Sequence, residues 1–305
     1  IFFSQRYSNY LFRPKLLILF CIFDILDYLC IINHWNKDMI VYPCAKINLG
    51  LNVVNKRIDG YHDLETVFYP VPLFDKLEIK QSNEPTSLEL GGFPLDGKPE
   101  ENLVIRAYNA VKQRYTIPDV SITLEKNIPS QAGMGGGSSD CAYMIKALNE
   151  MFGIGMSCCE MKEVAASLGA DCPFFINPGP SFATGIGEKL KQIPLSLKGY
   201  WIAVVNPPIA VSTREAFSKV VPKHPKERCD YVVLGDIYEW RKKLSNDFEN
   251  SVFGLYPVLE RIKQKFYEQG AVYSSMSGSG SAMYGIFKNE PPTFDIHGKC
   301  YKMIL

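Results

Sequence analysis

Glycine and serine crowd into one short segment, Pro129-Ser-Gln-Ala-Gly-Met-Gly-Gly-Gly-Ser-Ser-Asp140. Its four glycines lack the Cβ atoms that would keep backbone amides from closing around an anion. Ser138 and Ser139 then begin a predicted amphipathic helix, whose free amides and positive dipole end attract phosphate. The segment therefore predicts a phosphate-binding loop. A flexible glycine hinge before a helix is the alternative for such a turn standing alone.

The signatures of the common nucleotide-binding families are missing from this sequence. It contains no G-x-x-x-x-G-K-[ST], which excludes a P-loop nucleotidase. It has no G-x-G-x-x-G after a strand and neither H-R-D nor D-F-G, so neither a dinucleotide fold nor a protein kinase is indicated. A second glycine–serine turn at 277–281 lies between two predicted strands. Alone it predicts a tight turn, and together with the first loop it can close over the same ligand.

Three polar residues far from the loop are further candidates for chemistry. Asp171 follows a predicted helix and precedes the apolar run 173–176, so its carboxylate is expected to be partly shielded. Lys46 lies on the polar face of a predicted strand, where a charged side chain needs a partner or water. Asn48 shares that face and can hydrogen-bond a ligand. A capping aspartate, a solvated lysine and a strand-edge asparagine remain open as alternatives.

The apolar pattern predicts the elements that must position these residues. Alternation over 41–54 predicts a half-buried strand whose polar face carries Lys46 and Asn48. Further strands are predicted at 64–71, 76–80, 120–126, 201–205, 271–275 and 282–287, and helices at 102–114, 138–152, 160–168, 213–220, 237–251 and 256–268. Gly169 is expected to cap the helix before it. Strands and helices mix without a strict βαβ rhythm, which predicts an α+β protein of two lobes divided near 180–198.

Residues 1–38 differ from the rest of the chain. The run at 15–32 is the only long apolar stretch, and it is short for a membrane span. Asp24 and Asp27 lie within it, and each costs about 2.5–3.5 kcal/mol at a bilayer centre. We interpret residues 1–38 as a non-homologous extension, with the working protein beginning near Met39. An N-terminal anchor is the alternative.

Composition and charge narrow the class of protein. The chain has 305 residues, of which 47% are hydrophobic and 21% charged, as in an ordinary globular protein. Its 33 basic and 32 acidic residues give a net charge of +1, so no overall field attracts nucleic acid or acidic lipid. Nine cysteines without CxxC spacing predict reduced thiols and a cytoplasmic location. No stable membrane association is expected.

Several motifs together resemble the GHMP kinases, the family of galacto-, homoserine, mevalonate and phosphomevalonate kinases. In family order, these are Ala45-Lys46-Ile47-Asn48-Leu49, Gly60-Tyr61-His62, the glycine-rich loop, Gly169-Ala170-Asp171-Cys172-Pro173-Phe174-Phe175, and Ser277-Gly278-Ser279-Gly280. The resemblance spans about residues 40–288. It implies a two-lobed α+β fold, with an N-terminal lobe like ribosomal protein S5 domain 2 and a ferredoxin-like C-terminal lobe. The expected domains are the extension 1–38, an ATP-binding domain 39–190 and a C-terminal domain 191–305.

The resemblance also implies a role for each motif. Asp171 is implied as the base that takes the proton from the acceptor hydroxyl, with Lys46 as its partner. The residues implied to hold ATP are Pro129, Gly133, Met134, Gly135, Gly136, Gly137, Ser138 and Ser139. The residues implied to bind the acceptor are Asn48, Tyr61, His62, Thr213 and Phe217. The aromatic side chains among them would enclose a cytosine base, and ordinary core or helix packing is the alternative for them.

Within the family, the Lys-Ile-Asn, Gly-Tyr-His and Ala-Asp-Cys-Pro set narrows the resemblance further. It points to the branch that phosphorylates the 2-hydroxyl of a cytidine diphosphate-linked methylerythritol in the non-mevalonate route to isoprenoids. ATP is the implied donor, and Mg²⁺ is expected to arrive with it, because no cluster of His, Cys and carboxylates indicates a resident metal. The alternatives are a homoserine- or mevalonate-type kinase and a non-catalytic nucleotide-binding regulator. A monomer or homodimer with small-molecule substrates and no nucleic acid partner is expected.

Overall fold

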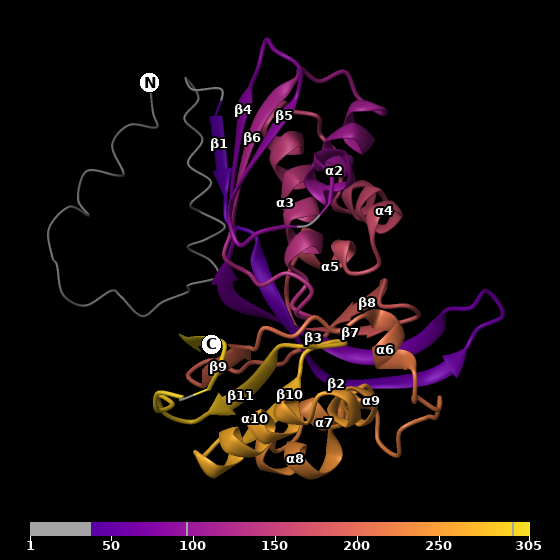
Figure 1. The fold of residues 1–305 in the computed structure, drawn as a ribbon. Helices are drawn as coiled ribbons and strands as arrows, with labels where there is room; N and C mark the ends of the chain where they lie inside the picture. Colours follow the sequence, from indigo (N-terminus) through magenta and orange to yellow (C-terminus); the bar gives the residue numbers. More distant parts are fainter. Residues whose placement is uncertain (1–37, 96, 295) are drawn as a thin grey trace, which may run out of the picture.

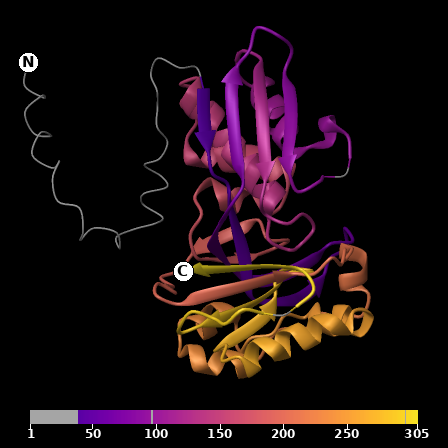
Figure 2. The ribbon, with the colours of Figure 1, turned by 60° about the vertical axis from the view of Figure 1, so that its left-hand side comes forward.

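The computed structural model describes residues 38–95, 97–294 and 296–305. Within these ranges the chain forms three four-stranded sheets, which follow one another from the top to the bottom of Figure 1. The upper sheet and its helices form one half of the molecule. The lower sheet and its helices form the other half, and the third sheet lies between them (Figures 1 and 2).

The upper sheet has the strand order β1-β4-β6-β5 and is covered on one face by helices (Figure 1). Its strands are β1 (Asp38–Val41), β4 (Lys76–Gln81), β5 (Ser87–Gly92) and β6 (Val120–Lys126). Its helices are η1 (Pro99–Glu101), α2 (Leu103–Lys112), α3 (Gly136–Met151) and α4 (Cys158–Leu168). Strand β6 alternates strictly between buried and exposed residues, because Val120, Ile122 and Leu124 pack in the core shared with the helices. This core holds α3, and therefore the end of the glycine-rich loop, against the sheet.

The middle sheet is antiparallel, with the order β2-β3-β7-β8. Its strands are β2 (Cys44–Lys56), β3 (His62–Phe74), β7 (Ser181–Thr184) and β8 (Lys189–Gln192), and the short helix α5 (Cys172–Ile176) precedes β7. Strands β2 and β3 continue into a long hairpin that extends to one side of the body (Figure 1). The start of β2 thus lies at the centre of the molecule, whereas the far end of the hairpin lies at its edge.

The lower sheet is antiparallel, with the order β10-β11-β9-β12. Its strands are β9 (Trp201–Asn206), β10 (Tyr273–Met276), β11 (Met283–Phe287) and β12 (Lys299–Ile304). Its helices are α6 (Thr213–Phe217), α7 (Cys229–Val233), η2 (Ile237–Glu239), α8 (Trp240–Lys243), α9 (Glu249–Leu255) and α10 (Pro257–Glu268). Apolar side chains of β2 and β3 share a core with Trp240, Tyr273 and Tyr284, so the middle and lower sheets are packed together.

The prediction of a half-buried strand at 41–54 is wrong. Strand β2 is buried on both faces from Cys44 to Val53, and even Lys46 is only 3% exposed. One face packs on the core of the lower half, and on the opposite face Lys46 lies against the glycine-rich loop, since a Cβ atom at Gly135 would lie 3.2 Å from its Cγ. At the edge of the strand, the Lys46 amide donates to the Met134 carbonyl oxygen at 3.0 Å. The period-two pattern is a property of the side chains alone, and it does not reveal a second layer that covers the polar face.

Other expected elements differ in their bounds. Helix α3 starts at Gly136 rather than at residue 138, so two glycines belong to its first turn. Gly169 is the C-terminal cap of α4, as expected, and its backbone there is extended, with φ −178°. The helix expected at 237–251 is divided into η2, α8 and α9, with Asn246 in the break paired to Leu51 of β2. Strands β5, β7, β8 and β12 and helix α7 were not anticipated.

The expected α+β architecture of two lobes is confirmed. The expected boundary between the ATP-binding domain and the C-terminal domain, between residues 190 and 191, stays a prediction. The interpretation of residues 1–38 falls outside the described residues except for Asp38, which with Met39 begins β1. Among the residues that the structure describes, no helix combines the length and apolar character needed to cross a membrane.

Candidate active site

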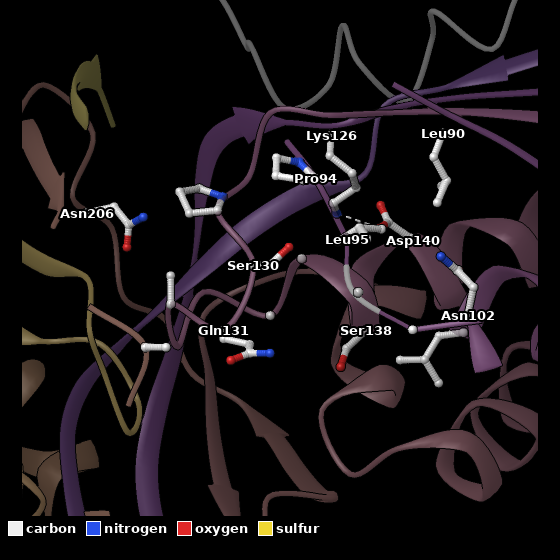
Figure 3. A pocket seen from close by; sticks show the side chains of 18 of the residues that line it. Leu90, Pro94, Leu95, Asn102, Lys126, Ser130, Gln131, Ser138, Asp140 and Asn206 are labelled. Carbon is white, nitrogen blue, oxygen red and sulfur yellow. Dashed lines mark hydrogen bonds and ion pairs between the residues drawn. The ribbon is translucent and has the colours of Figure 1, made fainter. Parts of the chain in front are cut away.

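A cleft of about 810 Å³ opens between the two halves of the molecule. Its floor is the glycine-rich loop and the start of α3, and its two walls come from segments far apart in the chain (Figure 3). One wall is built from residues between Leu90 and Leu103, and the other from Asn206–Ala210, just after β9. Both walls contain proline and aliphatic side chains, whereas the floor is rich in glycine and also carries the side chains of Ser130, Gln131 and Ser138. Such a cleft suits a ligand with a flat apolar end and an anionic end.

The glycines of the loop are required by the close approach of other parts of the chain. At Gly133, which has φ +73°, a Cβ atom would lie 1.9 Å from the Ser277 carbonyl oxygen. At Gly135, with φ +72°, a Cβ atom would lie 2.8 Å from the Phe175 ring. Since Gly135 is the residue before α3, the first amides of that helix have no helical acceptor and open toward the cleft floor. The loop can therefore cradle a phosphate, as its composition predicts.

Most of the predicted loop residues line the cleft, although two do not. Those that line it are Pro129, Gly133, Gly135, Gly136, Gly137 and Ser138. Met134 is buried and offers only its carbonyl oxygen, which accepts from Lys46. Ser139 is fully buried in α3, and its Oγ has no hydrogen-bond partner among the described residues. A direct phosphate contact of either side chain therefore needs the loop to move.

Lys46 and Asp171 meet beside the loop. Their Nζ and Oδ2 atoms are 3.6 Å apart, the Lys46 side chain is buried, and the Asp171 side chain is 34% exposed. Burial lowers the pKa of Lys46, and the nearby Asp171 carboxylate opposes that change. A Cβ atom at Gly135 would lie 3.2 Å from Cγ of Lys46, so the pair lies directly next to the cradle. The sequence separates the two residues by 125 positions, and the fold brings them together.

A chain of hydrogen bonds fixes the Lys46 ammonium group. Its Nζ donates to Oδ1 of Asn48 at 2.6 Å, and Nδ2 of Asn48 donates to Oγ1 of Thr66 at 2.9 Å. The Thr66 hydroxyl in turn donates to the Gly50 carbonyl oxygen at 2.5 Å. Asn48, expected to contact the acceptor, thus has both ends of its amide engaged inside the protein. Its evident structural task is to hold Lys46.

The second glycine–serine turn touches the loop but is not a wall of the cleft. Ser277 Oγ donates to the Gly133 carbonyl oxygen at 2.8 Å, and Ser281 Oγ donates to that of Ile209 at 2.6 Å. Residues 277–281 are absent from the cleft lining, which on this side comes from Asn206–Ala210. The expectation that the turn closes over the same ligand stays a prediction. In the structure the turn links the glycine-rich loop to the wall that faces it.

The aromatic residues lie at the other end of the site, where the β2–β3 hairpin meets α6. The rings of His62 and Phe217 are stacked, with centroids 4.5 Å apart and an interplanar angle of 24°. Tyr61 is 60% exposed, and Thr213 is an exposed residue in the first turn of α6. The structure brings His62 and Phe217 together as expected, and Tyr61 has no ring contact with another described residue. That Tyr61, His62 and Phe217 together bind a cytosine base stays a prediction.

Sequence reasoning missed three parts of the site. It did not find the walls at 90–103 and 206–210, although the Asn-Pro-Pro after the strand at 201–205 was a signal of a fixed turn there. It also missed Lys126, which lines the cleft and is buried between Asp75 and Asp140. Asp140 was interpreted only as an acidic residue in the first turn of a helix. No local pattern links these three charges.

Comparison with known proteins agrees with the motifs. The chain matches the family model for the GHMP kinases N terminal domain over residues 102–179 and the one for the GHMP kinases C terminal over 230–294. A relative from Parabacteroides distasonis, "4-diphosphocytidyl-2-C-methyl-D-erythritol kinase", is 50% identical over 255 residues, which are 84% of this chain and 93% of the relative.

Comparison with solved structures agrees with these sequence matches. A crystal structure of 4-(cytidine 5'-diphospho)-2C-methyl-D-erythritol kinase is 29% identical, has a TM-score of 0.73, and covers 87% of this chain and 98% of its own. Homoserine kinase from Cytophaga hutchinsonii shares the fold, with a TM-score of 0.63 at 16% identity over 83% of this chain and 86% of its own. The resemblance drawn from the motifs is thereby confirmed. The chain belongs to the GHMP kinases, in the family of the 4-diphosphocytidyl-2-C-methyl-D-erythritol kinases.

Proposed function

We propose that this chain transfers the γ-phosphate of ATP to the 2-hydroxyl of 4-diphosphocytidyl-2-C-methyl-D-erythritol, a step of the non-mevalonate route to isoprenoid precursors. The observation that carries the proposal is the buried Lys46 beside the partly exposed Asp171, held against a phosphate cradle. Relatives named for this activity support the choice of acceptor. The family supports ATP as the donor.

ATP is proposed to lie along the cleft. Its triphosphate would meet the amides of the glycine-rich loop and the first turn of α3, which are the anion-binding groups of the cleft floor. Its base would enter between the two apolar walls. This places the γ-phosphate at the end of the loop nearest Gly135, and therefore next to the pair of Lys46 and Asp171. The γ-phosphate of ATP and the Asp171 carboxylate, which is the proposed catalytic base, then face one another across a short distance.

Mg²⁺ is proposed to enter with ATP rather than to reside in the protein. Among the described residues, no group of three or more His, Cys, Asp or Glu side chains is placed to hold a metal. The hydroxyl of Ser138 lines the cleft and is a suitable oxygen ligand near the phosphates, whereas that of Ser139 is buried without a partner among the described residues and would reach the ion only after the loop moves. When bound, the ion supplies charge neutralisation for the phosphate oxygens.

The proposed chemistry assigns one task to each member of the pair. The Asp171 carboxylate accepts the proton of the acceptor hydroxyl, the freed oxygen attacks the γ-phosphorus, and ADP leaves with the bond between the β- and γ-phosphates broken. Lys46 keeps the carboxylate ionised and offsets negative charge on the phosphoryl group in transfer. Asn48 holds the ammonium group in place for both tasks.

The cytidine end of the acceptor is proposed to bind at Tyr61, His62 and Phe217. Stacking on an aromatic ring is worth about 1–3 kcal/mol per base. Because His62 and Phe217 stack on each other, the base either separates the two rings or stacks on an outer face with the exposed Tyr61. Thr213, at the other end of the short helix α6, would reach the same ligand. We propose a cytoplasmic enzyme acting on small molecules, as a monomer or a homodimer.

An acceptor panel tests this function. Purified chain is incubated with ATP, Mg²⁺ and, in separate samples, the cytidine-linked methylerythritol, homoserine or mevalonate, and ADP release is followed. We expect turnover with the cytidine-linked acceptor to exceed that with the other two by several orders of magnitude. Preference for homoserine or mevalonate would reject the proposed substrate, and ATP binding without turnover on any of the three would support the non-catalytic alternative.

A further inference from the structure

Three charged side chains are buried together under the nucleotide cleft. Lys126, the last residue of β6, contacts Asp75 and Asp140 with its ammonium group, and its Nζ lies 2.6 Å from Oδ2 of Asp140. All three side chains are at most 3% exposed. Buried charges of this kind persist only where they are paired. Neither the proposed phosphate cradle nor the proposed base uses them, so they need an explanation of their own.

The group connects both ends of the glycine-rich loop. At the beginning of the loop, Oδ1 of Asp75 accepts the amides of Asn127 at 2.5 Å and Ile128 at 2.8 Å. At the end of the loop, Asp140 belongs to the second turn of α3. Lys126 bonds to both carboxylates, so one side chain holds the two ends of the loop at a fixed separation. This buried group therefore fixes the position of the loop amides that face the cleft.

The same lysine also fixes one wall of the cleft. Its backbone carbonyl oxygen accepts the amide of Phe93 at 2.9 Å, where the chain leaves β5 for the wall segment. Gly92, with φ +77°, lets the two backbones come this close, because a Cβ atom there would lie 2.2 Å from the same oxygen. Gly136 likewise leaves room for the lysine side chain, since a Cβ atom at this position would lie 3.2 Å from the lysine Nζ. Figure 3 shows Lys126 and Asp140 between the wall and the loop.

The charge balance argues against Lys126 as a ligand of phosphate. The group carries a net charge of −1 with both carboxylates ionised and is neutral with one of them protonated, and the ammonium group is already occupied by two acceptors. A group of this charge does not attract a triphosphate. We propose that Lys126, with Asp75 and Asp140, is a positioning network that sets the spacing between the phosphate cradle and the wall of the nucleotide cleft. This inference rests on the proposed function, because it assumes that ATP occupies the cleft.

The test is direct measurement of Mg·ATP binding by calorimetry on the intact chain and on three variants, with the acceptor KM and kcat measured alongside. Lys126→Met removes the link, and we expect its ATP Kd to rise about tenfold or more, because misplaced groups lose oriented contacts. Asp140→Ala removes only the tie to α3 while Asp75 still pairs the lysine, so a rise of about fivefold is expected. Asp140→Asn keeps an acceptor for Lys126 and should bind ATP more tightly than Asp140→Ala. The acceptor KM should change less than twofold in all three.

Lys263→Met is the matched control. Lys263 is also largely buried and paired at 2.6 Å with a carboxylate, that of Glu249, but it does not line the cleft. The Lys263→Met variant should be less stable than the wild type and should bind ATP with the wild-type Kd. Wild-type affinity for ATP in folded Lys126→Met, or parallel loss of ATP and acceptor binding, would overturn the inference. If Lys126→Met does not fold, Asp140→Ala decides by the same criteria. A wild-type chain that binds no ATP would instead contradict the proposed function itself.

Discussion

The two ends of the candidate site are built in opposite ways. At the phosphate end, Lys46 is buried, bonded to Asn48 and adjacent to Asp171, and the glycine-rich loop is packed against Ser277. At the aromatic end, Tyr61 is 60% exposed on a projecting hairpin. The first region is held by contacts from all three sheets. The second depends on one hairpin and one helix of five residues.

This difference suits the phosphate end to phosphoryl transfer and the aromatic end to recognition of the acceptor. Groups that stabilise charge in phosphoryl transfer work best when they need no reorganisation, and buried hydrogen bonds provide that. Recognition of a base tolerates movement, since stacking is not strongly directional. The contrast predicts that changes at the phosphate end lower kcat, and that changes at the aromatic end raise the KM of the acceptor alone. Four experiments test this contrast.

The largest effect is expected for Asp171→Asn. An amide cannot accept the proton of the acceptor hydroxyl, so kcat should fall by about 10²–10⁴-fold. ATP binding should be unchanged, because Asp171 does not line the cleft. Asp119→Asn, which alters a surface aspartate paired with Lys112, is the control and should keep full turnover. Full activity in Asp171→Asn would remove its assigned role.

The second largest effect is expected for Lys46→Met. Its kcat should fall by roughly 10²–10³-fold, because one charge-stabilising group is lost. Its apolar side chain suits the buried position, but Oδ1 of Asn48 loses its donor, so the melting temperature should fall by a few degrees. Steady-state kinetics with both substrates, beside the surface variant Lys112→Met, measures the effect. A rise in the acceptor KM with normal kcat would assign Lys46 to binding and contradict the contrast.

At the aromatic end, Tyr61→Ala should raise the KM of the acceptor by roughly 5- to 100-fold, the equivalent of about 1–3 kcal/mol of stacking. The KM of ATP and kcat at saturation should stay near the wild-type values. Tyr238→Ala is the matched control, because Tyr238 is 56% exposed on another helix. Equal effects on ATP and acceptor would reject the stacking assignment.

The smallest effect concerns stability and pH at the phosphate end. Burial raises the pKa of Asp140 to about 7, partly offset by Lys126 and reinforced by Asp75. A carboxyl group with a raised pKa stabilises the fold at low pH and loses that contribution as the pH rises to about 7. Urea unfolding should therefore show a decrease of about 2–3 kcal/mol between pH 5 and pH 8 from this group. Asp140→Asn should have a flatter profile, and an unchanged profile would contradict the assignment.

The sequence predicts the phosphate end better than its surroundings. The glycine-rich loop and the motifs around Lys46 and Asp171 are local patterns, and their family order implies their proximity. Residues whose role depends on distant contacts were not recognised. Asp75, Lys126 and Asp140 appear as unrelated charges until β4, β6 and α3 pack together.

Burial and backbone conformation were the other sources of error. Strand β2 was expected to be half-buried, yet both of its faces are buried, and Lys46 on its polar face lies against Gly135 of a loop more than eighty residues later. The helix expected from residue 138 begins at Gly136 instead, directly after the left-handed Gly135. The direct stack of His62 on Phe217 was not expected either, because only the packing of α6 against the hairpin produces it. In each case tertiary contact overrides the local signal.

The most direct test of the central claim is the identity of the product. The chain is mixed with ATP, Mg²⁺ and the cytidine-linked methylerythritol, and the products are analysed by phosphorus and proton NMR. The account predicts one new phosphomonoester at the 2-hydroxyl, formed in the same amount as ADP. ADP accompanied only by inorganic phosphate, or a phosphate on another hydroxyl, would contradict the proposed placement of the acceptor beside Asp171.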